Sequence, residues 1–547
     1  MAFSGKIVFV LHAHLPFVRH PAYSRFLEED WLFEAITETY LPLLRVLRNL
    51  HDDGIPVRIG ISVSPTLVAM LEDSLLQERY LVHLDRLLEL SAKECERTRG
   101  DVEFEHLAKM YDGLFRKNRE DFVELYEKNI LKGFETLARQ GCIELFTTAA
   151  THSYLPLYQQ YPETVDAQIA LAVSSHRRAF GMEPHGMWLP ECGYYEGLER
   201  RLAKHGISYF FTAAHGVLFG SEPPKYGVYS PVRTPAGPVV FPRDLASANA
   251  VWSSDVGYPG DPVYREYYRD IGFDLPMDYI GPYIHPDGIR INTGMKYYRI
   301  TDRNSNKKEP YNPERAMQRV REHAHAFVNK QQQQVQLVAR FMDREPVITC
   351  PYDAELFGHW WFEGPAWLDQ VARLMASDSI PLSLAAPSDL LEDAEKYQEL
   401  QPAFSSWGNK GYSEVWLDGS NDWIYRHIHK AIERMHELAQ RFPDEDGMRE
   451  RALNQAAREL LLVQASDWPF IMRAGTTVHY AMNRVKEHLQ NFTRIYDELG
   501  GGKVSTDWLT QLEAEHCVFP DIDYRVFAGK YHYIEFSERE MSKIKPY

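Results

Sequence analysis

Short apolar runs alternate with longer amphipathic stretches along the first 400 residues of the chain. The runs are rich in Val, Ile, Leu and Phe, which is typical of strands buried on both faces. Seven runs are present: Lys6–Leu11, Val57–Val63, Ile143–Thr148, His185–Leu189, Ile207–Thr212, Val347–Cys350 and Ile380–Leu384. The stretches between them carry apolar residues at three- and four-residue spacing, as Trp31–Leu50 does before Gly54, and this spacing predicts amphipathic helices. The alternation predicts an α/β fold with a mostly parallel sheet.

Polar and ionisable residues stand just past the ends of several different runs. They are His12, His14, Ser64, His152, Glu191, His215 and Asp353. A β/α barrel builds its active site from the carboxyl ends of several strands, which meet at one rim. These positions therefore favour a closed barrel over an open sheet.

Three stretches depart from the alternation. Residues 67–139 are charged and helix-like, and residues 217–304 are irregular and rich in Gly, Pro and Tyr. Because long insertions at a catalytic rim usually cover or shape a site, we expect the second stretch to cover it. From about residue 401 the pattern changes to an aromatic loop region and then to long helices. We predict a catalytic barrel over residues 1–400 with two insertions, and a helical C-terminal domain over residues 401–547.

The charge and the composition limit the partners of the chain. Hydrophobic residues make up 44% of the sequence, which is enough apolar surface for a folded core. The 60 basic and 77 acidic residues give a net charge of −17, so no excess positive field attracts a polyanion and nucleic acid is not an expected partner. No apolar stretch reaches the ~20 residues that a membrane-spanning helix needs.

The N-terminus and the cysteines indicate the compartment. The N-terminal apolar run breaks at two histidines and has no small-residue cleavage site behind it, so it predicts a strand rather than a signal peptide. The five cysteines are widely spaced and form no C-x-x-C pair, which argues against a disulfide framework or a structural zinc site. A reducing, cytoplasmic location fits this pattern.

The segment Trp188–Tyr195 is the strongest candidate site. It places the carboxylate of Glu191 at the end of the fourth run, between aromatic and small residues. Aromatic faces stack on the C–H surface of a pyranose ring, and a carboxylate beside them can attack an anomeric carbon. A helix-capping role for Glu191 is about equally supported by the local sequence.

A second candidate site, Pro351–Trp361, also follows a predicted strand directly. Retaining glycoside chemistry needs one carboxylate to attack and a second, ~5–5.5 Å away, to protonate the leaving oxygen. Asp353 ends the strand and is the better candidate for the acid, whereas Glu355 lies beyond it and more plausibly orients its neighbours. We expect Trp360 or Trp361 to be a packing residue between helix and barrel.

His12 and His14 lie two residues apart and project from the same face of a strand or of its extension. This spacing suits a divalent-metal site, for which His152, His215 and Asp353 could supply further ligands. It suits equally a pair of hydrogen-bonding groups for sugar hydroxyls. The residues by themselves leave both interpretations open.

Five short segments, in order, resemble the regions by which glycoside hydrolase family 57 is recognised. They are His12–Pro16, Gly60–Pro65, Trp188–Glu191, Tyr352–Trp360 and Ala465–Phe470. The resemblance implies a distorted (β/α)7 barrel with a helical C-terminal domain. It also implies a nucleophile at Glu191, an acid/base at Asp353, and catalysis with no metal and no other cofactor.

Within this family the chain is most similar to the branching enzymes. The similarity rests on the fifth region, on Asp255–Asp261 followed by Tyr264–Glu266, and on Ser406–Leu417. It implies cleavage of α-1,4 bonds in an α-glucan and transfer of the chain to a 6-hydroxyl, with Trp407 and Trp416 guiding the acceptor chain. The residues expected to bind glucan are His12, His14, Trp31, His152, Trp188, Arg265, Trp360, Trp407, Trp416 and Asp467. The family also has a loop tyrosine that shields the intermediate, and Tyr226 and Tyr229 are the candidates for it.

Several alternatives remain at this point. Hydrolases and transferases of this type differ in whether water or a sugar hydroxyl arrives second, and the tryptophan-rich junction at residues 407–423 favours transfer. The main alternative is therefore an α-amylase or a 4-α-glucanotransferase of the same family. A metal-dependent polysaccharide deacetylase using His12 and His14 is a further alternative, and a non-catalytic glucan-binding role is weakened by the two carboxylates. The oligomeric state and the length of the transferred chain stay open.

Overall fold

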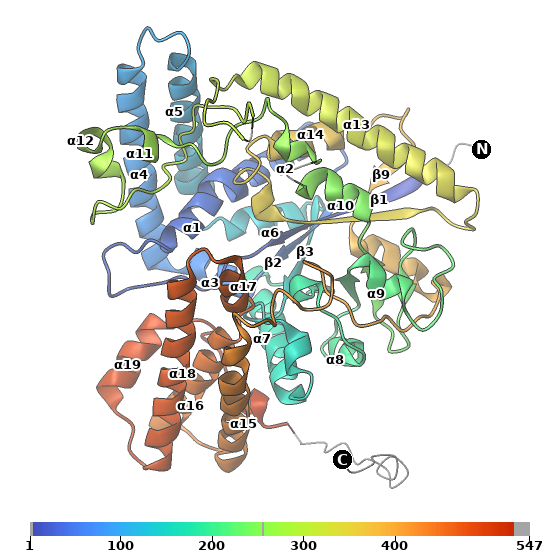
Figure 1. Ribbon diagram of the computed structural model, residues 1–547. Helices are drawn as coiled ribbons and strands as arrows, with labels where there is room; N and C mark the ends of the chain where they lie inside the picture. The colour runs from blue at the N-terminus through green and yellow to red at the C-terminus, as the bar shows by residue number, and fades with distance from the viewer. Residues whose placement is uncertain (1–3, 254–255, 303, 530–547) are drawn as a thin grey trace.

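Within residues 4–253, 256–302 and 304–529, which the computed structural model describes, nine strands form a curled sheet that helices surround (Figure 1). Eight of these strands follow the order β6-β7-β5-β4-β3-β2-β1-β8, and β9 pairs with β1. Their bounds are β1 Gly5–Ala13, β2 Ile59–Val63, β3 Ile143–Thr148, β4 Gly186–Trp188, β5 Tyr209–Thr212, β6 Val232–Arg233, β7 Val239–Pro242, β8 Val347–Asp353 and β9 Leu382–Leu384. Asp255 of the predicted motif and residues 530–547 of the predicted C-terminal domain lie outside the described residues.

The strands curl into a barrel. β1 has a parallel neighbour on each edge, so that Val10 lies opposite both Gly60 of β2 and Pro351 of β8. The parallel pairing continues from β2 through β3, β4 and β5 to β7. An isolated parallel bridge between Arg243 and Thr349 then joins the end of β7 to β8. In the described part of the chain, seven parallel strands thus form the predicted distorted (β/α)7 barrel of an α/β protein.

Each predicted run overlaps a strand of the sheet. One barrel strand, β7, comes from a segment in which no run is predicted. β9, in the run 380–384, pairs with the first half of β1, at Gly5–Ile7. β7 fills the place beside β5, although it lies within residues 217–304, where the pattern predicts irregular structure. Its apolar run is short and is flanked by Pro238 and Pro242, so local sequence alone does not distinguish it from a loop.

Helices cover the outside of the barrel and bury their apolar faces against it. α2, for example, buries Leu44, Leu47 and Leu50, and α7 ends at Gly181, which adopts the left-handed conformation at a φ of 63°. The helices of this part are α1 Glu29–Glu34, α2 Leu41–Asp52, α3 Pro65–Glu72, α4 Ser74–Arg97, α5 Glu105–Glu120, α6 Leu131–Arg139, α7 Pro162–Phe180, α8 Leu198–Lys204, α9 Ala214–Leu218, α10 Leu245–Trp252, α11 Ile271–Asp274, α12 Met277–Ile280, α13 Pro313–Ala339 and α14 Gly364–Met375.

The two insertions meet above the barrel. α4 and α5 stand side by side and extend away from the sheet, and α11 and α12 lie against them (Figure 1). The hydroxyl of Tyr279 donates a 2.8 Å hydrogen bond to Glu94 of α4, and that of Tyr283 donates a 2.7 Å hydrogen bond to Glu89. The helical insertion, residues 67–139, therefore holds the segment that follows β7 by hydrogen bonds to α4.

The C-terminal helices pack on one another at one side of the barrel (Figure 1). They are α15 Tyr425–Arg441, α16 Gly447–Val463, α17 Asp467–Ala474, α18 Val478–Gly500 and α19 Thr506–Glu515. Their core includes a buried carboxylate, Glu459, which His488 and His516 contact at 2.8 and 2.7 Å. The turn between α16 and α17 brings Ser466 and Asp467 to the barrel rim, where the main-chain N–H of Ser466 donates to the carbonyl oxygen of His152. No helix in the described ranges is long and apolar enough to cross a bilayer.

Candidate active site

Glu191 lies in a strained turn directly after β4. It belongs to the short 3-10 helix Pro190–Cys192, and its φ of 61° is in the left-handed region that non-glycine residues rarely adopt. Its carboxylate accepts a 2.6 Å hydrogen bond from Nε1 of Trp407 and a 3.1 Å hydrogen bond from Oγ of Ser466. The strained backbone thus directs the carboxylate into the barrel mouth, where residues of the loop after 400 and of the helical domain hold it.

Asp353 ends β8 and lies opposite His12 of β1 in the strand register. Burial raises the pKa of Asp353 to about 6, and electrostatic interactions with Arg243 and then His14 oppose the shift. Asp353 and Glu191 follow two different strands, β8 and β4, at one barrel rim, and the charge of Asp353 disfavours the charge of Glu191.

Burial also raises the pKa of Glu191, to about 8, with hydrogen bonds from Trp407 and Ser466 lowering it and the charge of Asp353 raising it. Taken singly, the two pKa values place the proton on Glu191 at pH 7. The hydrogen bonds argue for the opposite placement, because both partners donate to the carboxylate and two donors stabilise its charged form. Both pKa values are raised, so the pair retains a proton near neutral pH, and the two donors favour the anion of Glu191.

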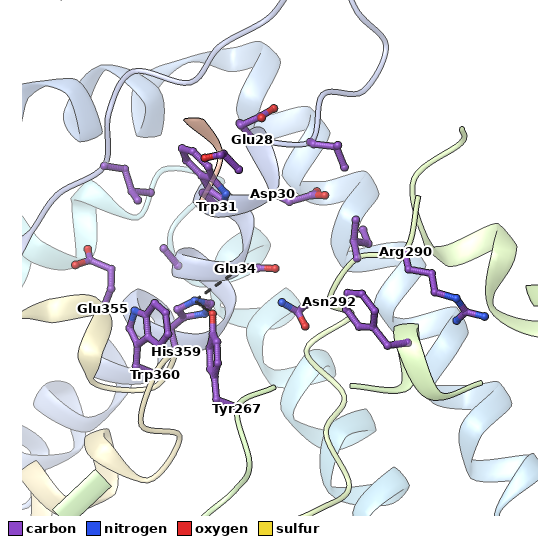
Figure 2. Close-up of a pocket in the computed structure, with 16 residues that line it drawn as sticks. Glu28, Asp30, Trp31, Glu34, Tyr267, Arg290, Asn292, Glu355, His359 and Trp360 are labelled. Carbon is purple, nitrogen blue, oxygen red and sulfur yellow. Dashed lines mark hydrogen bonds and ion pairs between the residues drawn. The ribbon is translucent and has the colours of Figure 1, made fainter. Parts of the chain in front are cut away.

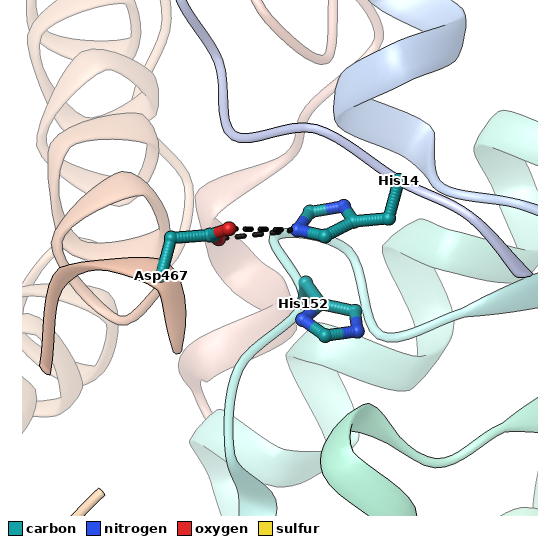
Figure 3. A group of neighbouring side chains, drawn as sticks. All are labelled: His14, His152 and Asp467. Atoms are coloured by element: carbon teal, nitrogen blue, oxygen red, sulfur yellow. Dashed lines mark hydrogen bonds and ion pairs between the residues drawn. The ribbon is translucent and has the colours of Figure 1, made fainter. Parts of the chain in front are cut away.

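His12, His14 and His152 lie together at the barrel rim. Figure 3 shows His14 and His152 beside Asp467 of the helical domain. Nε2 of His12 lies 2.9 Å from Nε2 of His152, and the ring of His152 stacks on that of His14 at 3.9 Å between centroids. His14 also contacts the carboxylate of Asp467 at 3.1 Å. Burial lowers the pKa values of His12 and His152, as does the charge of the neighbouring His14. These two rings are therefore neutral, and each has one nitrogen that donates and one that accepts.

His14, His152 and Asp467 also form a group that could hold a metal ion, since their ligand atoms lie within 4.8 Å of one another. Their nitrogens already have partners in the protein, however. Nδ1 of His14 contacts Oγ of Ser64 at 2.9 Å, and Nδ1 of His152 contacts Oγ of Ser466 at 2.8 Å. His215, the further ligand considered from sequence, contacts the carbonyl oxygen of Gly411 at 2.9 Å. The group therefore fits a hydrogen-bonded cluster at the barrel rim.

The segment after Asp353 is fixed by close packing against the helical elements that follow β1. Gly358 has a φ of 112°, and a Cβ there would lie 1.8 Å from the carbonyl oxygen of Glu38, so only glycine fits. The carboxylate of Glu355 accepts a 2.5 Å hydrogen bond from the hydroxyl of Tyr40 and a 3.2 Å hydrogen bond from the main-chain N–H of His14. Glu355 thus contacts Tyr40 and the main chain of His14, which is consistent with the orienting role that the sequence predicts.

A cavity of about 490 Å³ lies beside this segment (Figure 2). Trp31 borders it on one side, and Trp360 with Tyr267 border it on the opposite side. Trp360 is 51% exposed, whereas Trp361 is 1% exposed and packs against Trp367. Trp360 therefore keeps a ring face open to a ligand, and Trp361 is the packing residue of the pair.

The structure distributes the other predicted tryptophans between two roles. Trp188 is fully buried and stacks on the ring of His12 at 4.8 Å, so it positions that histidine. Trp407 is half-buried and lies between Trp188 and Glu191. Trp416 is 2% exposed and stacks on Tyr154 at 4.9 Å, so it has no open face for an acceptor chain. This burial corrects the expectation for Trp416, which is a packing residue beneath the loop.

The two loop tyrosines differ from expectation, whereas the role of Arg265 stays a prediction. The Arg265 side chain is 2% exposed and lies over the ring of Phe362 at 4.2 Å, and Arg265 is one of the residues that line a cavity beside Trp360. Tyr229 accepts a hydrogen bond from Val347, the first residue of β8. At ~3.3 Å per residue, that end of β8 is about 20 Å from Asp353. Tyr226 precedes Tyr229 by one turn and lies against Lys225 and Arg344, so neither tyrosine shields the site in this structure.

Arg243 is a site residue that the sequence pattern does not identify. It follows β7, it is one of the charges that lower the pKa of Asp353, and it lies 5.2 Å from the ring of Trp407. The Arg243 guanidinium thus lowers the pKa of Asp353 and contacts the ring of Trp407, which donates to Glu191. Because β7 is not predicted from the sequence, Arg243 does not stand after a predicted strand.

Comparison with known proteins identifies the class of protein that this fold and site define. The sequence profile of glycosyl hydrolase family 57 matches residues 8–349, and that of the C-terminal part of 1,4-alpha-glucan branching enzymes matches residues 427–527. The chain belongs to glycosyl hydrolase family 57, as the five regions predict.

Individual relatives extend over nearly the whole chain. A 1,4-alpha-glucan branching enzyme of Thermococcus kodakarensis is 34% identical over 90% of this chain and 74% of its own length. The crystal structure of a branching enzyme of this family from Pyrococcus horikoshii has a TM-score of 0.86 at 31% identity, covering 96% of this chain and 97% of its own. That of the alpha-amylase AmyC from Thermotoga maritima has a TM-score of 0.91 at 46% identity, covering 97% and 100%.

Proposed function

We propose that this protein is a retaining 1,4-α-glucan branching enzyme with Glu191 as nucleophile and Asp353 as acid/base. The observation that carries the proposal is the difference between the two carboxyl groups. Glu191 accepts hydrogen bonds from Trp407 and Ser466, which favour its anion, and burial raises the pKa values of both carboxyl groups, so the pair keeps a proton that Asp353 can hold. A charged carboxylate and a protonated one at the same rim are what retaining glycoside chemistry requires.

The reaction proceeds by double displacement. The Glu191 carboxylate attacks C1 of the donor glucosyl unit while Asp353 transfers its proton to the leaving oxygen, so the α-1,4 bond breaks and a glycosyl ester forms. Asp353, now charged, then removes the proton of an incoming 6-hydroxyl, which attacks C1 and displaces Glu191. The two inversions restore the α configuration. The Nε2 atoms of the neutral His12 and His152 rings, which contact each other at 2.9 Å, are the nitrogens that can turn to sugar hydroxyls when glucan binds.

An α-amylase is the second candidate, and it is favoured by the similarity to the Thermotoga maritima protein. The two activities share the first displacement and differ in the second, where water replaces the sugar hydroxyl. The match of residues 427–527 to the C-terminal part of branching enzymes supports transfer.

One experiment separates the two candidates. The purified protein is incubated with amylose, and the anomeric protons of the product are recorded by NMR. We expect α-1,6 signals that grow while α-1,4 signals fall, with few new reducing ends. Short linear products without α-1,6 signals would instead assign the chain to the amylases.

We further propose that residues 1–400 and 401–547 act as two domains that share this site and that the protein works in the cytoplasm. The five cysteines are free, including the buried Cys192 beside the nucleophile, which supports a reducing compartment. The expected α-glucan partner follows from the proposed reaction.

A further inference from the structure

A second cavity, also of about 480 Å³, lies on the other side of Trp360 from the one that Trp31 borders. It runs between α10 and the segment 259–269. We call it the outer groove, and its lining includes Trp252, Tyr268, Arg269, Asn306 and Trp360. No residue beyond Tyr267 and Trp360 lines both cavities, as far as the described chain extends.

Tyr267 and Trp360 form a rigid wall between the two cavities. Their rings stack at 4.3 Å between centroids. The Tyr267 hydroxyl lies 3.1 Å from Nε2 of His359, whose Nδ1 lies 2.8 Å from the buried carboxylate of Glu38. The buried Lys296 donates a 2.7 Å hydrogen bond to the carbonyl oxygen of Tyr267. The contacts of Tyr267 with His359 and Lys296 are half-buried, so they position the ring on which the exposed Trp360 stacks.

The outer groove has the composition of a carbohydrate site. Trp252, Trp360 and Tyr268 are 38%, 51% and 78% exposed, and three large aromatic side chains around one concavity are rarely left open without a ligand. Polar groups such as Arg269 and Asn306 lie between them. Aromatic faces with interspersed hydrogen-bonding groups match the alternating C–H and hydroxyl surfaces of glucose units.

The groove is also connected to the catalytic carboxylates. The ring of Trp252 lies 6.3 Å from that of Trp407, which donates to Glu191. At the other end, Leu356 lines the groove three residues after Asp353. A chain lying in the groove therefore passes beside the site where the glycosyl ester forms.

We propose that the outer groove binds one arm of the acceptor glucan, with the other arm in the cavity bordered by Trp31. This inference rests on the proposed function. When a terminal 4-hydroxyl attacks, the acceptor chain extends from the reacting unit in one direction only, and water has no chain at all. When a 6-hydroxyl in the middle of a chain attacks, glucose units continue on both sides of the reacting unit, so the chain needs a binding path on each side. Two cavities separated by one aromatic wall supply this arrangement.

The test compares branching with cleavage in Tyr268→Ala. Tyr268 is the most exposed ring in the groove and has no contact with Glu191 or Asp353 among the described interactions. We expect α-1,6 bond formation on amylose to fall about three- to tenfold, the factor typical of one lost aromatic contact, with the rate of α-1,4 cleavage within about twofold of wild type. Tyr268→Phe, which keeps the ring, should retain branching, and Phe341→Ala, which removes an exposed ring far from the groove, should change neither rate. An equal fall in branching and cleavage, or no fall in either, overturns the proposal.

Binding to the inactive Asp353→Asn variant separates this inference from the proposed function. Maltoheptaose titrated calorimetrically should show two binding events, and adding Tyr268→Ala should weaken one of them about threefold or more. If the wild-type protein forms no α-1,6 bonds but this weakening occurs, the groove is confirmed and the branching function falls. If branching occurs and Tyr268→Ala alters neither its rate nor the binding, the groove proposal falls alone.

Discussion

Trp407 donates two hydrogen bonds to Glu191, one from its indole ring and one from its main chain. Its indole Nε1 lies 2.6 Å from the Glu191 carboxylate, and its main-chain nitrogen lies 2.8 Å from the Glu191 carbonyl oxygen. The second bond helps to hold the left-handed turn, and the first orients and stabilises the charge of the nucleophile. A residue 216 positions away in the sequence thus sets both the backbone and the side chain of Glu191.

Trp407→Phe removes the indole donor and keeps an aromatic ring. We expect kcat for α-1,4 cleavage to fall about 10- to 100-fold, because a hydrogen bond to a charged group contributes about 1.5–3 kcal/mol. The acidic limb of the pH profile should also move to higher pH, since the anion of Glu191 loses a donor. Trp416→Phe is the matched control, because Nε1 of Trp416 is buried without a hydrogen-bond partner in the structure. A Trp407→Phe profile that overlays the wild-type one would count against the assigned role of this bond.

Trp416→Ala should act on stability rather than on the choice of acceptor. Its ring is buried against Tyr154, so its removal leaves a cavity and should lower the free energy of unfolding by about 3–5 kcal/mol. Denaturant unfolding measures this loss. Branching and hydrolysis, measured below the unfolding transition, should fall by the same factor. A selective loss of branching would restore the acceptor role that the sequence predicts.

Glu191→Gln and Asp353→Asn should each remove nearly all activity, because both carboxyl groups serve in one displacement. We expect the rate of α-1,4 cleavage to fall by about 10⁴-fold or more in each. Circular dichroism should confirm that both variants fold. Residual activity within tenfold of wild type in either variant contradicts the assignment of that residue.

The rate of α-1,4 cleavage should depend on pH as a bell. The active form holds one proton on the pair, so activity falls on the acidic side when Glu191 gains a proton and on the alkaline side when Asp353 loses its own. The raised pKa values of the pair, about 6 and about 8, set the two limbs. They belong to the pair and not to one residue each. A plateau extending down to pH 4 would show that burial does not raise these pKa values.

Treatment with EDTA should leave the rate unchanged. His14, His152 and Asp467 have hydrogen-bond partners in the protein and are expected to bind sugar hydroxyls or one another rather than a metal. The measurement is the rate of α-1,4 cleavage after chelation and dialysis, followed by addition of zinc. Activity that disappears on chelation and returns with zinc would support the deacetylase-like alternative.

Much of the fold follows from the chain by itself. Strands such as β1, which contains the continuous apolar run Ile7–Leu11, are buried on both faces, so the pattern reveals them without any partner. β7 is different, because Val239–Pro242 is short and lies between prolines, and only its pairing with β5 makes it a strand. Arg243 was missed for the same reason.

The candidate site divides in the same way. Glu191, Asp353 and the histidines stand directly after strands of a parallel barrel, and the strand ends of such a barrel converge, so their positions in the sequence place them together. Tertiary structure alone decided that Trp416 is buried while Trp360 is open, and that Tyr229 lies at the far end of β8. The exposure of an aromatic ring and the direction in which a loop crosses a barrel depend on contacts between residues hundreds of positions apart. Those contacts cannot be inferred from neighbouring residues in the sequence, whereas the periodicity of a strand or helix can be recognised within a short segment.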